Sequence, residues 1–170
     1  IRDRIENITA DNARLVSNLH ANLGGLYRMN GHPDLAREHM EKSISLLDQF
    51  NLLHINDSIP QIANYAMFLT EQQEPERGIS ELQKLSGIIK EYHSDDCLDY
   101  AKVQETLGTI YLMTANLPQA KTHFKRAFKI YEKIWADEPE MIEAKYQEIQ
   151  ELYPQIGFSI GKNLSLLLTK

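Results

Sequence analysis

The sequence has one cysteine, no cluster of basic residues and no long apolar run, and each absence excludes a class of protein. Cys97 cannot form an internal disulfide, which is typical of a reducing compartment, so we expect a cytoplasmic location. The formal net charge of −6, without a basic run, argues against a surface for nucleic acid. No apolar run approaches the length of about 20 residues that crosses a bilayer, so we predict no membrane partner.

The sequence also lacks the motifs of common enzymes and metal sites. No glycine-rich phosphate loop is present, and no histidine stands beside a nucleophile in a recognisable motif. The segment His93 to Cys97 contains two aspartates, but four ligands with zinc-like spacing are absent. We therefore interpret it as a solvated loop before a helix, and we predict no enzymatic activity, no cofactor and no metal.

The chain does contain one pattern that recurs at a fixed distance. The stretch LGTIYLMTANLPQAKTHFKRA, from Leu107 to Ala127, has apolar residues three and four positions apart, which predicts two amphipathic helices joined near Asn116. A similar stretch starts at Leu23 and a weaker one at Tyr65, so both steps are 42 residues (65 − 23 and 107 − 65). This repetition predicts an all-α chain of helix hairpins.

Each copy of the pattern has one small residue on each helix. The pairs are Gly24 with Ala36, Ala66 with Gly78, and Gly108 with Ala120. Glycine inside a helix costs about 1 kcal/mol relative to alanine, so we infer that the two helices approach closely at each pair. We expect Gly78 and Gly108 each to face a small residue on the partner helix.

Prolines and polar residues mark the predicted helix starts. The second helices should begin at Pro33, Pro75 and Pro118, because proline at the first turn loses no helical hydrogen bond. We expect Thr9, Asp57 and Ser94 to be the N-caps of the first helices.

We predict a single solenoid domain over residues 1–170. Its repeats cover about residues 9–50, 57–91 and 95–136, followed by an inserted helix over 138–152 and a partial repeat over 155–170. A strict 42-residue spacing would place the fourth leucine-like position at Ile149, but residues 163–170 (NLSLLLTK) match residues 64–71 (NYAMFLTE) better. We expect the chain to be a segment of a longer array that forms a homodimer through its uncovered last helix.

The spacing of the third copy resembles the tetratricopeptide repeat. The residues that carry the resemblance are Leu107, Gly108, Tyr111, Ala120, Phe124 and Ala127. The 42-residue period resembles the kinesin-light-chain variety, whose helices are longer than those of the usual unit of about 34 residues. This resemblance implies a right-handed superhelical solenoid of antiparallel helix pairs, whose first helices line a concave groove for peptides or partner proteins.

The same resemblance implies which residues face the groove. They are Asn18, Asn22, Gly25 and Met29 from the first copy, Asn64, Met67 and Glu71 from the second, Lys102, Glu105, Thr109 and Met113 from the third, and Asn163 from the fourth. An amide side chain has both a donor and an acceptor, which suits an extended peptide backbone. The alternative is that Asn22 and Asn64 only stabilise the stacking of helices.

These observations predict a non-enzymatic scaffold that binds a protein or an extended peptide. Two alternatives remain. The chain could be a peptide-sensing regulatory domain of a larger regulator that carries a DNA-binding or ATPase effector. It could also be a structural module that associates with itself.

Overall fold

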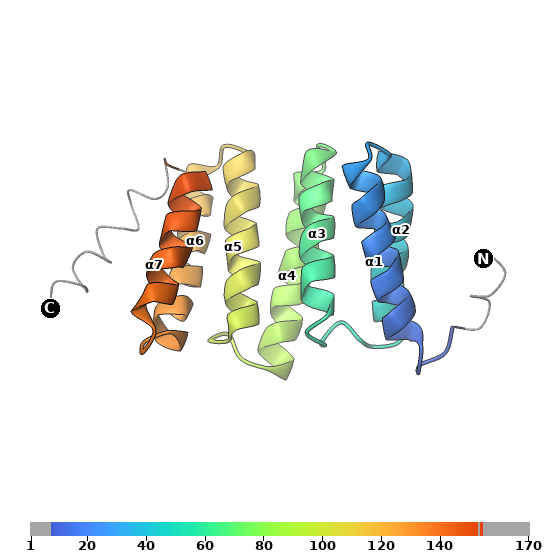
Figure 1. Cartoon of the computed structure of the whole chain (residues 1–170), viewed down its shortest axis with the longest axis horizontal. Helices are drawn as coiled ribbons and strands as arrows, with labels where there is room; N and C mark the ends of the chain where they lie inside the picture. Colours follow the sequence, from blue (N-terminus) through green and yellow to red (C-terminus); the bar gives the residue numbers. More distant parts are fainter. Residues whose placement is uncertain (1–7, 153, 155–170) are drawn as a thin grey trace, which may run out of the picture. The chain divides into compact units, whose positions relative to one another are not determined.

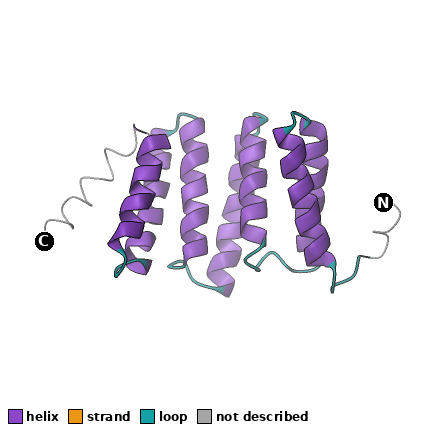
Figure 2. Cartoon of the chain, viewed as in Figure 1, coloured by secondary structure: helices purple, strands orange, loops and turns teal. Residues whose placement is uncertain are grey.

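The computed structural model describes residues 8–152 and residue 154, and every regular element in this part of the chain is an α-helix (Figure 2). The helices are α1 (Ala13–Met29), α2 (Pro33–Gln49), α3 (Ser58–Glu71), α4 (Pro75–Tyr92), α5 (Leu98–Met113), α6 (Leu117–Ile134) and α7 (Pro139–Leu152) (Figure 1). The all-α prediction is confirmed. None of these helices combines the length and the apolarity needed to cross a membrane.

The chain divides into two compact units, one ending at Tyr92 and the other beginning at His93. In the first unit α1 packs on α2 and α3 packs on α4, while α3 also contacts α1 and α2. In the second unit α6 packs on both α5 and α7. Helices that follow each other in sequence therefore form hairpins, as in a helical repeat solenoid. The assignment of residues 1–170 to one domain remains a prediction, and residues 155–170 lie outside the described part.

Prolines begin the second helix of each hairpin, as predicted. Helices α2 and α4 start at Pro33 and Pro75, and Pro118 is the second residue of α6. At these positions the missing N–H has no helical acceptor, so the ring fixes the backbone without losing a hydrogen bond.

The predicted N-caps of the first helices are wrong in two cases. Helix α5 is capped by Cys97, whose Sγ accepts from the Tyr100 backbone N–H at 3.4 Å. Ser94 instead accepts from the backbone N–H of Asp96 within the preceding loop. The N-cap position of α1 is Asn12 rather than Thr9.

Asp57 does occupy the N-cap position of α3, but its side chain makes no capping bond. Its carboxylate lies 3.5 Å from the guanidinium of Arg14 on α1. The sequence pattern therefore predicted the N-cap position correctly, but the Asp57 side chain pairs with Arg14 on another helix.

Gly78 provides the close approach between α3 and α4. A Cβ at Gly78 would lie 2.6 Å from the carbonyl oxygen of Ala66, closer than ordinary contact allows. The prediction that Gly78 faces a small residue on the partner helix is confirmed.

In the other two hairpins the glycine makes room for a large side chain. A Cβ at Gly108 would lie 2.9 Å from Cδ2 of the buried Phe124, so the prediction that Gly108 faces Ala120 is wrong. At Gly24 the nearest atom is Cγ of the buried Met40, at 2.6 Å, and the backbone oxygen of the predicted partner Ala36 follows at 3.2 Å. Met40 and Phe124 are two periods apart (124 − 40 = 84), so both hairpins use the same packing.

Two apolar clusters hold these hairpins against their neighbours. In the first unit the cluster joins α2 to α3, and its buried residues are Ala36, Met40, Tyr65, Phe68 and Leu69. In the second unit it joins α5 and α6 to α7, and its buried residues are Leu112, Ala120, Phe124, Phe128 and Ile149.

The burial of Ile149 concerns the assignment of α7 as an inserted helix or as the first helix of a fourth unit. The residue is 1% exposed, and α7 starts 41 residues after α5 (139 − 98), close to the repeat period. This burial shows that α7, which coincides with the helix predicted over 138–152, packs into the core of the second unit, and its assignment as an inserted helix remains a prediction.

Candidate ligand groove between α1 and α3

A groove of about 460 Å³ lies between α1 and α3 in the first unit. Its lining comprises Asn18, Ala21, Asn22, Gly25, Arg28 and Met29 of α1, Met40 and Ser43 of α2, and Asp57, Pro60, Gln61 and Asn64 at or beside α3. Five of the residues predicted to face a groove therefore line one surface. They are Asn18, Asn22, Gly25, Met29 and Asn64.

Polar contacts join α1 to α3 at three levels along the groove. Arg14 pairs with Asp57 at 3.5 Å, Gln61 Nε2 donates to Asn18 Oδ1 at 2.5 Å, and Arg28 Nε donates to Glu71 Oε2 at 2.8 Å. The difference in residue number is 43 at each level (57 − 14, 61 − 18 and 71 − 28). A constant difference means that the two helices run side by side in the same direction.

At the middle contact, Ser17, Ser43 and Gln61 form a buried polar cluster that also holds the half-buried Asn18. Gln61 Oε1 accepts from the hydroxyls of Ser17 at 2.8 Å and of Ser43 at 2.5 Å, while its Nε2 donates to Asn18. All three of the residues Ser17, Ser43 and Gln61 are buried, and Gln61 is the most exposed of them at 8%. The Gln61 amide is thus held at both ends, and the Oδ1 acceptor of Asn18 is occupied, which leaves the Asn18 NH₂ group for the groove.

Sequence reasoning missed Ser17, Ser43 and Gln61, although the repeats contain a signal. One period later, the positions of Ser17 and Ser43 are occupied by Ile59 and Leu85. Polar residues in one copy at positions that are apolar in another indicate a local polar interaction inside the array.

Asn22 and Asn64 line the groove and are both exposed. Within residues 8–152, neither side chain makes a hydrogen bond to another side chain or to the backbone. The two amides therefore differ from Asn18, whose acceptor is taken by Gln61.

The remaining predicted residues of α3 lie outside the groove lining. Met67 is half-buried on α3, and Glu71 pairs with Arg28; neither is among the residues that line the groove. Asn163 lies outside the described residues.

The predicted residues of the third copy all lie on α5, in the second unit. Lys102 Nζ is 3.8 Å from the Asp99 carboxylate, and the Thr109 hydroxyl donates to the backbone carbonyl of Glu105. Met113 is 47% exposed. Their role in ligand binding remains a prediction.

Glu105 already has two partners within the second unit. Its carboxylate accepts from the Tyr131 hydroxyl at 2.6 Å and from Lys145 Nζ at 3.0 Å. Burial, followed by the Glu105 carboxylate, raises the pKa of Tyr131 well above its usual range. Burial acts to lower the pKa of Lys145, but Glu105 and Glu148 together raise it. Glu105 therefore joins α5 to α6 and α7.

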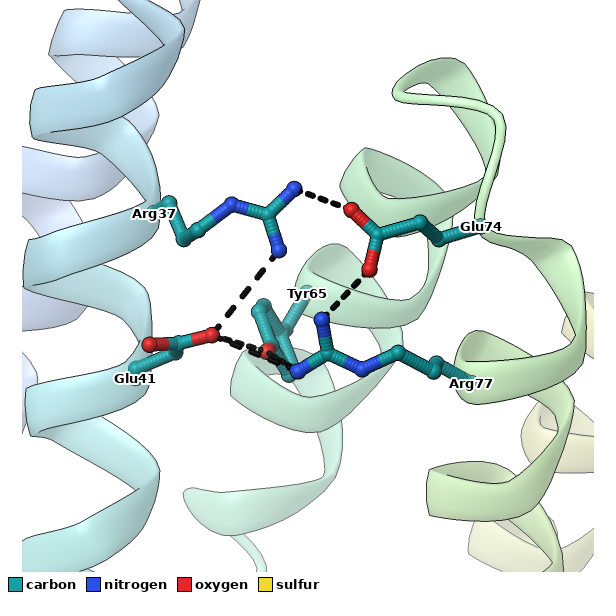
Figure 3. A network of polar contacts seen from close by, with 5 residues as sticks. All are labelled: Arg37, Glu41, Tyr65, Glu74 and Arg77. Atoms are coloured by element: carbon teal, nitrogen blue, oxygen red, sulfur yellow. Dashed lines mark hydrogen bonds and ion pairs between the residues drawn. The ribbon is translucent and has the colours of Figure 1, made fainter.

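An ionic cluster of Arg37, Glu41, Tyr65, Glu74 and Arg77 joins the first hairpin to the second (Figure 3). Arg37 on α2 donates to Glu74 at 2.5 Å, and Arg77 on α4 donates to the same carboxylate. The Tyr65 hydroxyl donates to Glu41 at 2.8 Å. Hydrogen bonds from Arg77 and then Arg37 lower the pKa of Glu74, while burial and Glu41 raise the pKa of Tyr65. These contacts fix α2 against α3 and α4.

A pair of histidines joins α1 to α2. The Nδ1 atoms of His20 and His39 are 2.8 Å apart, and Tyr27 stacks on His39 with ring centroids separated by 5.3 Å. Burial, then the nearby His39 and Lys42, lower the pKa of His20. Since one nitrogen must accept, the contact requires at least one neutral ring.

The second unit has the same arrangement two periods later, with glutamine in place of one histidine. His123 Nδ1 lies 2.9 Å from Gln104 Oε1, and Tyr111 stacks on His123. Gln104 corresponds to His20 (104 − 20 = 84). An amide oxygen accepts from either charge state of the histidine, so this contact tolerates protonation.

Comparisons with known proteins agree with the repeat pattern. Residues 58–133 match the family model of the tetratricopeptide repeat. The crystal structure of BtubC (BKLC) from P. vanneervenii is similar to the chain, with a TM-score of 0.71 and 17% sequence identity. That similarity covers 92% of this chain and 61% of BtubC, and at this identity it shows the fold alone. No curated protein matches the chain. The kinesin-light-chain variety remains a prediction.

Proposed function

We propose that the α1–α3 groove binds an extended peptide segment of a partner protein. This proposal is supported by the match of residues 58–133 to the tetratricopeptide repeat, since proteins with this repeat are generally protein–protein interaction scaffolds. The observation that carries this proposal is the pair of exposed amides, Asn22 and Asn64, which line the groove without a side-chain partner in residues 8–152. Each amide has a donor and an acceptor for a peptide backbone.

The open part of the groove has a length that suits a short extended segment. Between the contact at Asn18 and the contact at Arg28, α1 advances ten residues (28 − 18), or about 15 Å at the helical rise. An extended chain rises about 3.3 Å per residue, so about four peptide residues fit this interval. Asn22 and Gly25 lie within it.

The proposal is tested by removing each amide. Asn64→Ala and Asn22→Ala should each weaken the binding of a peptide, selected from a displayed random library, by about 1–3 kcal/mol, because a peptide group would be left unpaired. Gln83→Ala is the matched control, since Gln83 is an exposed amide on α4 that does not line the groove. Calorimetry gives the affinity and thermal unfolding gives the stability.

The opposite outcome would identify the amides as stacking residues. If Asn64→Ala lowers the melting temperature while the affinity stays at the wild-type value, the groove does not read a peptide backbone through Asn64.

We propose further that side chains of the third copy influence which ligands are preferred. Lys102→Ala is the clearer test, because Lys102 is exposed and pairs only loosely with Asp99 at 3.8 Å. Glu105→Ala is the less specific test, because it would also remove the contacts of Glu105 with Tyr131 and Lys145 inside the second unit. The family is typically a non-catalytic scaffold, and we propose the same for this chain.

A further inference from the structure

Two of the helical glycines in the described residues have no packing reason to be glycine. A Cβ at Gly24, Gly78 or Gly108 would come within 3 Å of a neighbouring atom, so packing requires a glycine at each. At Gly25 and Gly87 a Cβ would meet nothing within 4 Å. Glycine destabilises a helix relative to alanine, so at these two positions the fold alone would favour a side chain. Of the two, Gly25 lines the groove.

The other repeats carry side chains at the position of Gly25. One and two periods later the residues are Met67 (67 − 25 = 42) and Thr109 (109 − 25 = 84). The first hairpin alone lacks a side chain at this level of its first helix. The missing side chain leaves open space in the groove, between the levels of Asn22 and Arg28.

The charged residues around this space are paired, and the other residues of the groove lining are uncharged. The apolar lining residues of the groove are Ala21, Met29, Met40 and Pro60. The charged lining residues, Arg28 and Asp57, are both held in ion pairs by Glu71 and Arg14. An apolar ligand group would bury its surface here without displacing a free charge, whereas a charged group would find no unpaired countercharge among these residues.

We propose that Gly25 is the specificity position of the groove, where a bound peptide inserts one uncharged apolar side chain of about leucine or methionine size. This inference rests on the proposed function, in which Asn22 and Asn64 hold the peptide backbone. The absent side chain at Gly25 defines the volume that the ligand fills.

The test removes a side chain from the peptide in one experiment and adds a side chain to the protein at Gly25 in another. Peptides selected on the wild-type chain from a displayed random library should share one apolar position, and alanine at that position should weaken binding about tenfold or more. Gly25→Leu should weaken the selected peptide by a similar factor, because its side chain occupies the same space. The alanine-substituted peptide should lose much less affinity on Gly25→Leu.

Two further variants test whether the effect depends on side-chain size and on the position in the groove. Gly25→Ala should have an intermediate effect, and Gly87→Leu should leave binding unchanged, because Gly87 lies on the exposed side of α4 outside the groove. Both positions are open and both substitutions favour helix, so the variants should melt at or above the wild-type temperature.

The outcomes separate this inference from the proposed function. Selected peptides that share a charged position, or that bind Gly25→Leu as tightly as wild type while still depending on Asn64, overturn the role of Gly25 and leave the groove function standing. If no peptide binds, or if binding is independent of both Asn22 and Asn64, the proposed function fails and this inference fails with it.

Discussion

Gly78→Ala tests the close approach of α3 and α4 in the first unit. The new Cβ would lie 2.6 Å from the Ala66 carbonyl oxygen, about 0.8 Å inside the range of ordinary contacts that begins at 3.4 Å. The neighbouring atoms belong to the backbone, which cannot rotate away as a side chain can. The two helices must therefore separate, and overpacking of this kind costs about 1–3 kcal/mol.

The magnitude is best measured against Gly87→Ala on the same helix. Both substitutions gain about 1 kcal/mol of helix propensity, but a Cβ at Gly87 meets nothing within 4 Å. Gly87→Ala should therefore stabilise the chain by about 1 kcal/mol, while Gly78→Ala should be neutral or destabilise it by up to about 2 kcal/mol. The propensity term cancels in the comparison, so the two variants should differ by about 1–3 kcal/mol.

Urea unfolding followed by far-ultraviolet circular dichroism gives the free energy of unfolding. Trp135, the single tryptophan, follows α6, so its fluorescence reports the second unit separately. The difference in stability between Gly78→Ala and Gly87→Ala should appear in the dichroism, because both glycines lie on α4 in the first unit. Equal stabilities for the two alanine variants would refute the reasoning, because α3 and α4 would then not be in contact at Gly78.

Two more predictions concern polar contacts. Burial and His39 lower the pKa of His20 in the folded chain, so the unfolded chain binds the proton more readily. The free energy of unfolding of the first unit should therefore decrease as the pH falls through about 6.5. Urea titrations at several pH values should show a weaker pH dependence for His20→Gln, and an unchanged slope would contradict the prediction. Glu105→Ala should destabilise the second unit by about 1–3 kcal/mol, because the Tyr131 hydroxyl and Lys145 Nζ both lose their acceptor. An unchanged urea midpoint in Trp135 fluorescence would exclude this role for Glu105.

The hairpins were predictable because their signals are local. Apolar spacing at three and four positions, with proline at the first turn of each second helix, is enough to locate α2 to α6. Five of the expected groove residues line one surface because equivalent positions on neighbouring first helices face the same way.

Other features depend on side-chain direction and on proximity between distant residues. Phe124 is one turn after Ala120, and a helical side chain leans toward the N-terminus, so the ring rather than Ala120 meets Gly108. Gln61 contacts residues on two other helices, and only the packed structure shows that its amide is satisfied by Ser17.

The ionic cluster between the first two hairpins has a consequence for the order of repeats in the chain. The packing residues recur at each period and would let hairpins stack in any sequence, but the cluster does not recur. One period after Tyr65, Glu74 and Arg77 the chain has Leu107, Asn116 and Gln119. If the third hairpin were spliced directly after the first, Arg37 and Glu41 would lose their countercharges and hydrogen-bond partners at the new junction. The cluster therefore identifies the second hairpin as the correct neighbour of the first and disfavours misassembly between repeats of similar shape.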